Sequence, residues 1–287
     1  MGELFVLVSL TYLFSITFGR LLEKFKIPWI FSALFLGIII SSLHIPFFEN
    51  VITSKEFDFL ANLGLLFMLF IVGFELEIKQ LKSLSKFILF TTLFIVLFDV
   101  STGTLLLSCF GYPLMVSLIC AFSFATVGEV VLVPILDEFK LMKSKMGATI
   151  IGVGTFDDVI EVFTIFLAAT LIGTSVKGFN PYFSTVSTLS LLFLFFGFLK
   201  FKKEIKRSWR ISPKIEDFFL FSLFILFAFI SVGFFGSLEM LGALLAGIGV
   251  RNFLPKNVLE GVENAIRLIG YGLFGILFFL WVGIHTN

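Results

Sequence analysis

The sequence predicts an all-α polytopic membrane protein, and three observations carry that prediction. The 287 residues are 58% hydrophobic, include 43 phenylalanines, and only 14% of them are charged. Apolar runs of the length that crosses a bilayer recur from one end of the chain to the other. Lysine and arginine gather in alternate joints between these runs, as they do in cytoplasmic loops. A soluble domain is thereby excluded.

Ten membrane spans are expected, of which the second and the ninth are short. In chain order they cover residues 3–22, 28–45, 57–76, 86–109, 112–136, 146–172, 182–200, 215–234, 238–251 and 264–284. The first run has no basic segment before it and no convincing cleavage site after it, so we expect a span rather than a removable signal peptide.

The basic residues predict the orientation of the chain. Of the 21 lysines and arginines, 19 fall in the odd-numbered joints or at the span ends beside them, and only Lys55 and Lys177 lie in the other joints. We therefore expect the N-terminus outside, the basic loops in the cytoplasm and the C-terminus outside. The lysine-rich joint 200–214 is expected to face anionic lipid.

An internal repeat is predicted, in which position n corresponds to position n + 210. SALFLGIII (32–40) matches GALLAGIGV (242–250), and LFIVGFE (69–75) matches FLWVGIH (279–285) at this same repeat offset. Chance identities are common in apolar sequence, but a constant offset across two spans strengthens these. The charge pattern gives the two copies opposite orientations, which is the construction of many secondary transporters.

The repeat predicts the organisation of the chain. A first unit of six spans covers 1–172, a linker span and basic loop cover 173–214, and a second unit of three spans covers 215–287. Copies of the fourth, fifth and sixth spans would lie beyond residue 287. The expected total is therefore thirteen spans, of which ten are present.

Carboxylates interrupt the sixth predicted span, which contains the run GVGTFDDVIEVF. Asp157 and Asp158 lie about 17 Å into this span at 1.5 Å per residue, near the bilayer centre. Glu161 can share a helix face with either aspartate. Gly152 and Gly154 permit a neighbouring helix to approach closely. Three acids are thus placed where ionised carboxylates are most costly to keep.

The fifth predicted span contains FSFATVGEVVLVPIL, where polar and helix-breaking residues interrupt the apolar run. Pro134 removes a backbone donor, and Thr126 and Gly128 ease a break. Glu129 adds a further acid. Unwound backbone at membrane depth is tolerated where it is buried in protein or lines a cavity, and broken helices supply ligands to bound ions. A broken helix beside the sixth span is therefore expected.

These features predict a site for a monovalent cation and for protons at Asp157 and Asp158, with Glu129, Glu161 and Thr126 beside them. Every basic residue lies in a joint or within about two turns of one, so no buried cation is expected as a partner. Intramembrane acids without such partners are by default ion or proton sites. Desolvation and a neighbouring carboxylate both favour protonation, and oxygen ligands suit a hard cation such as Na⁺. Competition between the cation and the proton for this one site is sufficient to couple their fluxes across the membrane. The alternative is that the acids are simply protonated and hydrogen-bonded.

Other chemistry finds little support in the sequence. Asp99, in the middle of the fourth predicted span, is a weaker candidate for a role in transport. No motif indicates a nucleotide, a metal cofactor, covalent catalysis or nucleic-acid binding. We therefore expect no enzyme activity and no cofactor.

The stretch LGLLFMLFIVGFELEIKQL (63–81) resembles the third-span motif of the Kef-type and bacterial Na⁺/H⁺ antiporters of the second cation:proton antiporter group. The stretch from FSFATVGEVV through TFDDV resembles their fifth and sixth spans, and the likeness covers essentially the whole chain. It implies exchange of Na⁺ or K⁺ for protons by an elevator-like movement, a homodimer, and a place in the cell membrane of a bacterium.

The resemblance also implies roles for single residues. Asp158 corresponds to the essential ion-binding aspartate, Asp157 to the position before it, and Thr126 to the unwound segment. An Asp-Asp pair at this point is associated with electrogenic exchange in the family. Glu129 and Glu161 depart from the pattern. So does the absence, within the 287 residues, of the family's lysine in the tenth or eleventh span and of a second broken helix.

Two other functions remain open at this point. A Na⁺-coupled organic-anion symporter shares the inverted-repeat core, although few polar groups are available for an organic substrate. A non-transporting fragment or subunit that needs the missing helices is the other alternative.

Overall fold

The computed structural model describes residues 2–25, 27–43, 45–75, 78–125, 132, 135–136, 139–141, 144–154, 156–157, 181–200, 214–236 and 238–286. The regular elements among these residues are all helical. In chain order they are α1 (Gly2–Lys24), α2 (Phe31–Leu43), α3 (Pro46–Ile52), α4 (Lys55–Glu75), α5 (Ile78–Cys109), α6 (Leu114–Phe124), α9 (Pro181–Lys200), α11 (Ile215–Phe234), α12 (Glu239–Phe253), α13 (Lys256–Arg267), the π-helical η1 (Leu268–Gly275) and α14 (Ile276–His285).

Five helices in the described part of the chain are long and apolar enough to cross a membrane. They cover Gly2–Lys24, Lys55–Phe74, Lys86–Cys109, Ile215–Phe234 and Lys256–His285. A sixth candidate arises if α2 and α3, which are bent by 120° relative to each other, count as one span. The all-helical membrane architecture is thus confirmed, whereas the number ten also depends on stretches outside the described residues.

Two short helices, α3 and α13, were not predicted. Proline precedes or begins each one: Pro46 is the first residue of α3, and Pro255 is the N-cap of α13. Proline suits the first turn of a helix because no intrahelical partner awaits its missing N–H there. Hydropathy did not register α13 as a separate element, since it carries polar residues along one side and continues without a break into η1 and α14.

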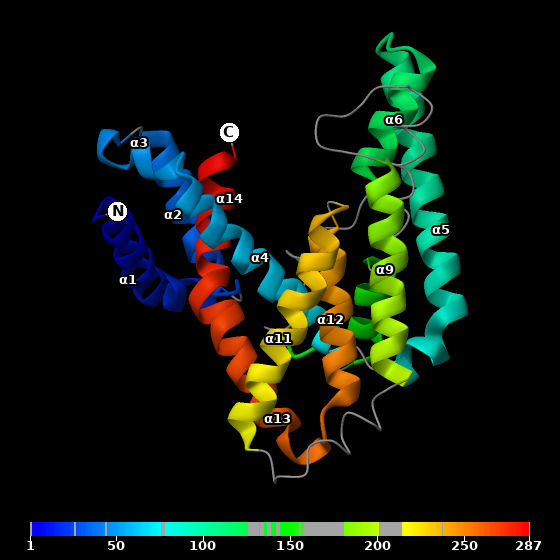
Figure 1. Ribbon diagram of the computed structural model, residues 1–287. Coiled ribbons are helices and arrows are strands. Elements are labelled where there is room, and N and C mark those ends of the chain that lie inside the picture. The colour runs from blue at the N-terminus through cyan, green and yellow to red at the C-terminus, as the bar shows by residue number, and fades with distance from the viewer. Residues whose placement is uncertain are drawn as a thin grey trace.

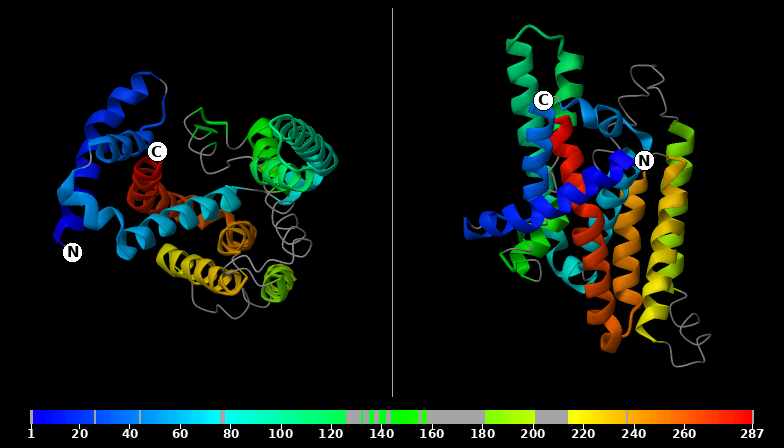
Figure 2. Two further views of the ribbon diagram at one scale, coloured as in Figure 1. Left: turned by 90° about the horizontal axis from the view of Figure 1, so that it is seen from above. Right: turned by 90° about the vertical axis from the view of Figure 1, so that its left-hand side faces the viewer.

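Figures 1 and 2 show α4, α12 and α14 in the middle of the molecule, with α1 and α2 to one side and the α5–α6 pair to the other. A large apolar cluster joins α4 to α9, α11, α12 and α13, and a second cluster joins α1 and α2 to α4 and α14. The α5–α6 pair has a small cluster of its own, which contains Val96, Val100, Ala121 and Ala125. The described helices therefore form one central body with a helical pair beside it.

The helix ends follow the predicted repeat offset. The helices α1, α2 and α4 end at Lys24, Leu43 and Glu75, and their counterparts α11, α12 and α14 end at Phe234, Phe253 and His285. Every end is separated from its counterpart by the same repeat offset, and so are the first residues of the short helices α3 and α13. In Figure 1, α2 ends beside α3 near the top and α12 ends beside α13 at the bottom, so these two helices run in opposite directions.

Two glycine crossings follow the same offset. The helix α2 meets α14 where Gly37 faces Gly283, and α4 meets α12 where Gly73 faces Gly247. A Cβ added at Gly37 would lie 2.4 Å from a carbonyl oxygen of α14, and one added at Gly247 would lie 2.2 Å from a carbonyl oxygen of α4. The residues that own these two oxygens are themselves related by the repeat offset. Both crossings bring backbone against backbone, which only glycine allows.

Candidate ion-binding site

The segment that carries the predicted aspartates begins with a capped helix over residues 145–154. The Ser144 Oγ accepts a hydrogen bond from the Gly147 N–H at 3.0 Å and donates one to the Leu141 carbonyl oxygen at 2.6 Å. A serine in this place satisfies an N–H that the first helical turn leaves without a partner. The four residues 151–154 are all buried. Protein therefore surrounds the part of the helix that leads to the acids.

One side of this helix rests on the crossing of α4 and α12. Ile151 belongs to an apolar cluster with Val72 of α4 and with Leu244 and Ile248 of α12. All four side chains are at most 5% exposed. These contacts set the position of residues 145–154 against the middle of the molecule.

The α5 helix lies against the same segment. The Thr92 hydroxyl, which is 1% exposed, lies 2.9 Å from the carbonyl oxygen of Ile88 and 3.4 Å from that of Val153. Residues 145–154 are thus held between α5 and the α4–α12 crossing.

Asp157 lies in a helical stretch three residues after Gly154 and is 2% exposed. A carboxyl group buried in this way is kept from water and must be met by protein groups or by a bound ligand. Both packing glycines, Gly152 and Gly154, are buried as well. The remaining predicted residues lie outside the described part of the chain: Asp158, Glu161, Glu129, Thr126, Gly128 and Pro134.

The helix of the fifth predicted span is short. It begins after Pro113 and ends at Phe124, so α6 has 11 residues. At its end the Ala125 N–H bonds to the Phe122 carbonyl oxygen at 3.3 Å, which tightens the last turn. The described helix therefore stops directly before Thr126, the first of the residues for which a break is predicted.

Asp99 is exposed on α5. It lies seven residues from Thr92, which is about two helical turns along the same face. Whereas Thr92 is covered by residues 145–154, Asp99 is not covered by the described residues.

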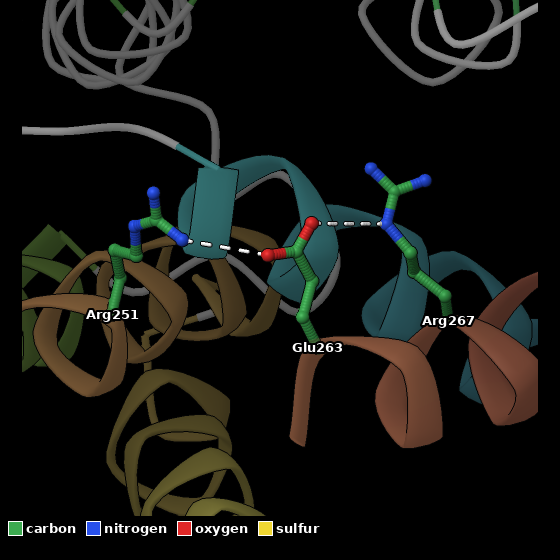
Figure 3. Close-up of polar contacts among 3 residues, drawn as sticks. All are labelled: Arg251, Glu263 and Arg267. Carbon is green, nitrogen blue, oxygen red and sulfur yellow. Dashed lines mark hydrogen bonds and ion pairs between the residues drawn. The ribbon is translucent and has the colours of Figure 1, made fainter. Parts of the chain in front are cut away.

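A group of charges that the sequence reasoning missed joins the ends of α12 and α13. Glu263 lies between two guanidinium groups, with one carboxylate oxygen 3.5 Å from Arg251 and the other 3.5 Å from Arg267 (Figure 3). Arg251 also lies over the ring of Phe74 at 5.9 Å, which ties the end of α4 to the group. The charge pattern counts both arginines with the ninth joint, at the ends of the predicted spans 238–251 and 264–284, whereas their side chains are largely buried in ion pairs. The spacing of Glu263 and Arg267, four residues apart on one helix, could have signalled one of these pairs.

These observations define a class of protein: a multi-pass helical membrane protein with a buried carboxyl group in a helix held between packed spans. Comparison with known proteins gives the family. Residues 9–287 match the family model described as sodium/hydrogen exchanger, transmembrane. The chain therefore belongs to this family of cation/proton antiporters, which are transporters and not enzymes.

Individual relatives agree with the family match. The chain is 29% identical to the probable Na⁺/H⁺ antiporter 3 of Methanocaldococcus jannaschii, over 99% of this chain and 71% of that protein. It is 24% identical to the Na⁺/H⁺ antiporter of Enterococcus hirae, over 92% of this chain and 68% of that protein. It is 23% identical to the Na⁺/H⁺-K⁺ antiporter GerN of Bacillus cereus, over 99% of this chain and 72% of that protein. The resemblance noted from the span motifs is confirmed at the level of the family.

Proposed function

We propose that the protein exchanges a monovalent cation, Na⁺ or K⁺, for protons at an intramembrane site formed by Asp157 and Asp158. The observation that carries the proposal is the burial of Asp157, which is 2% exposed and closely follows residues 145–154, the helix that packs against α4, α12 and α5. Burying a carboxyl group at membrane depth costs free energy, and intramembrane acids of this kind are by default ion or proton sites. The names of the relatives, which speak of Na⁺/H⁺ and K⁺ exchange, support the choice of ligands.

The proposed mechanism is alternating access. A carboxylate pair accepts a cation when it is deprotonated, and a proton displaces the cation, so the two compete for one site. A carrier that reorients only when the site holds one of them exchanges the two. Glu129, Glu161 and Thr126 are proposed as further ligands, and no cofactor is proposed. An elevator-like movement of the part that bears the site, relative to α4 and α12, is proposed as the change that alternates access.

We also propose the repeat organisation that underlies this mechanism. The first unit covers 1–172, the linker span and basic loop cover 173–214, and the second unit covers 215–287. The repeat offset that helix ends and glycine crossings share supports it. A homodimer in the cell membrane, with the N-terminus outside and the basic loops in the cytoplasm, completes the proposal.

Reconstitution tests the function directly. The 287-residue chain is placed in vesicles with an imposed pH gradient, and a pH-sensitive dye follows the collapse of the gradient when Na⁺, K⁺ or Li⁺ is added. We expect cation-dependent proton movement that Asp158→Asn abolishes. Glu216→Gln, which removes an exposed acid at the start of α11, serves as the control and should keep full activity.

The same vesicles test the role of the second aspartate. If Asp157 supplies the charge that makes exchange electrogenic, Asp157→Asn should leave exchange running but remove its dependence on membrane potential. An unchanged response in Asp158→Asn would refute the site, and the absence of exchange with all three cations in the unmodified chain would refute the function.

A further inference from the structure

The crossing of α4 and α12 is joined directly to the segment that leads to Asp157. A Cβ at Gly73 would lie 2.0 Å from the carbonyl oxygen of Leu244 and 3.1 Å from the N of Ile248. Leu244 and Ile248 are the two buried α12 residues in the apolar cluster that contains Ile151. The backbone that meets Gly73 therefore carries the side chains on which residues 145–154 rest.

The repeat builds this apolar surface twice. At the repeat offset, Leu244 and Ile248 correspond to Leu34 and Ile38, and Val72 corresponds to Val282, so all three residue types are the same. The second copy surrounds the crossing of α2 and α14, where backbone meets backbone as closely as at the first. The two surfaces differ in what covers them. Val72, Leu244 and Ile248 are 0–5% exposed, whereas their three counterparts are only half-buried.

We propose that the α4–α12 surface formed by Val72, Leu244 and Ile248 positions the ion site. Ile151 is the side chain that packs on this surface, and it lies six residues before Asp157 in the sequence. In the conformation that the structure describes, a displacement of this buried segment against its close-packed neighbours would open a void or cause a clash. The three residues are positioning residues that act through residues 145–157, and they need not touch the ion.

The transport consequence of this inference rests on the proposed function. Loose seating of residues 145–154 spreads the carboxyl groups over several positions, which weakens binding that requires several oxygen ligands at once. We expect Leu244→Ala to raise the Na⁺ concentration for half-maximal exchange about tenfold, the equivalent of about 1.4 kcal/mol. The maximal rate should change little and the pH profile should shift, while Leu244→Met should restore both because it refills the volume.

Leu34→Ala is the matched control. It makes the same deletion in the same residue type at the corresponding glycine crossing, but Leu34 does not share a cluster with Ile151. We expect Leu34→Ala to leave the Na⁺ concentration for half-maximal exchange and the pH profile unchanged. If Leu244→Ala fails to fold, Ile248→Val and its counterpart Ile38→Val make the same comparison with a smaller cavity.

A cross-linking measurement tests the positioning without any transport. Cysteines replace Thr92 and Val153, whose hydroxyl and carbonyl oxygens lie 3.4 Å apart, in a background in which Cys109 and Cys120 are serine. Disulfide formation between positions 92 and 153 should slow several-fold in Leu244→Ala and not in Leu34→Ala.

The cross-linking and exchange measurements distinguish the positioning proposal from the proposed transport function. A selective effect of Leu244→Ala on the cross-link in a protein that does not exchange cations would uphold the positioning and refute the function. The opposite outcome would overturn the positioning alone. In that case the unmodified protein exchanges cations, and Leu244→Ala and Leu34→Ala have equal rates of cross-linking and equal Na⁺ concentrations for half-maximal exchange.

Discussion

Replacing Gly247 by alanine tests how the two central helices are held together. The new Cβ would lie 2.2 Å from the carbonyl oxygen of Phe70, whereas ordinary contact begins at 3.4 Å. The helices must therefore part by the difference between these two distances or tilt by a comparable amount. Because the obstacle is backbone, no side-chain rotation relieves it, and parting the helices opens voids beside Phe70, which is 0% exposed.

The size of the effect follows from two opposing terms. Overpacking a close-packed interior costs about 1–3 kcal/mol, and a backbone clash belongs near the upper end of this range. Replacing a mid-helix glycine by alanine contributes about 1 kcal/mol of helix propensity. We expect Gly247→Ala to lose about 2 kcal/mol of stability. Gly37→Ala should lose a similar amount, since its contacts repeat those of Gly247 in the other copy of the repeat.

Thermal denaturation in detergent, followed by intrinsic fluorescence and by the loss of the monodisperse elution peak, measures these differences. Gly197→Ala on α9 is the matched control, since among the described residues no atom beyond its chain neighbours and its own helix backbone lies within 4 Å of the added Cβ. It should gain up to about 1 kcal/mol. Equal stability of Gly247→Ala and Gly197→Ala would refute the backbone crossing, and a harmless Gly37→Ala beside a damaging Gly247→Ala would refute the equivalence of the two crossings.

Three further substitutions probe contacts elsewhere. Glu263→Gln removes the carboxylate between two arginines and should cost about 2–3 kcal/mol in the same denaturation assay, whereas Glu260→Gln, exposed on the same helix, should cost nothing measurable. Ser187→Ala deletes a 2.6 Å hydrogen bond from α9 to a carbonyl oxygen of α11 and should cost about 1 kcal/mol. Trp281→Phe removes the indole N–H that donates to Asp58 at 2.7 Å, which should cost about 1–2 kcal/mol, and an unchanged midpoint would exclude that bond.

Much of the helical framework could be predicted because it depends on local composition. The predicted spans 3–22 and 215–234 agree within two residues with α1 and α11. The fourth span was placed less well, since α5 begins at Ile78, eight residues before the predicted start. Lysines lower the hydropathy of that first part without preventing a helix, because lysine is a good helix former. Hydropathy thus locates the part of a helix that is apolar, and the helix itself extends further.

The candidate site could be predicted only in part. The burial of Asp157 agrees with the expectation of an acid enclosed within the membrane region. Which groups enclose it did not follow from the sequence, because Val72 and Leu244 are far from residue 151 in the chain and no local pattern pairs them. The ion pairs of Glu263 escaped notice for a related reason. One partner, Arg251, was counted as a loop residue, and its burial depends on the end of α4 reaching it.

The sequence by itself determined where the apolar helices run, the constant offset at which similar stretches recur, and the presence of acids within an apolar run. All of these depend on residue order, since a helix must satisfy its own backbone and hide its polar groups wherever it lies in a membrane. The tertiary structure alone decided that the repeated glycines meet across the two copies, Gly37 with Gly283 and Gly73 with Gly247. It also decided that, among the described residues, the second of these crossings is the one that packs with Ile151. The repeat makes the two crossings alike, and the packing of residues 145–154 on one of them makes them different.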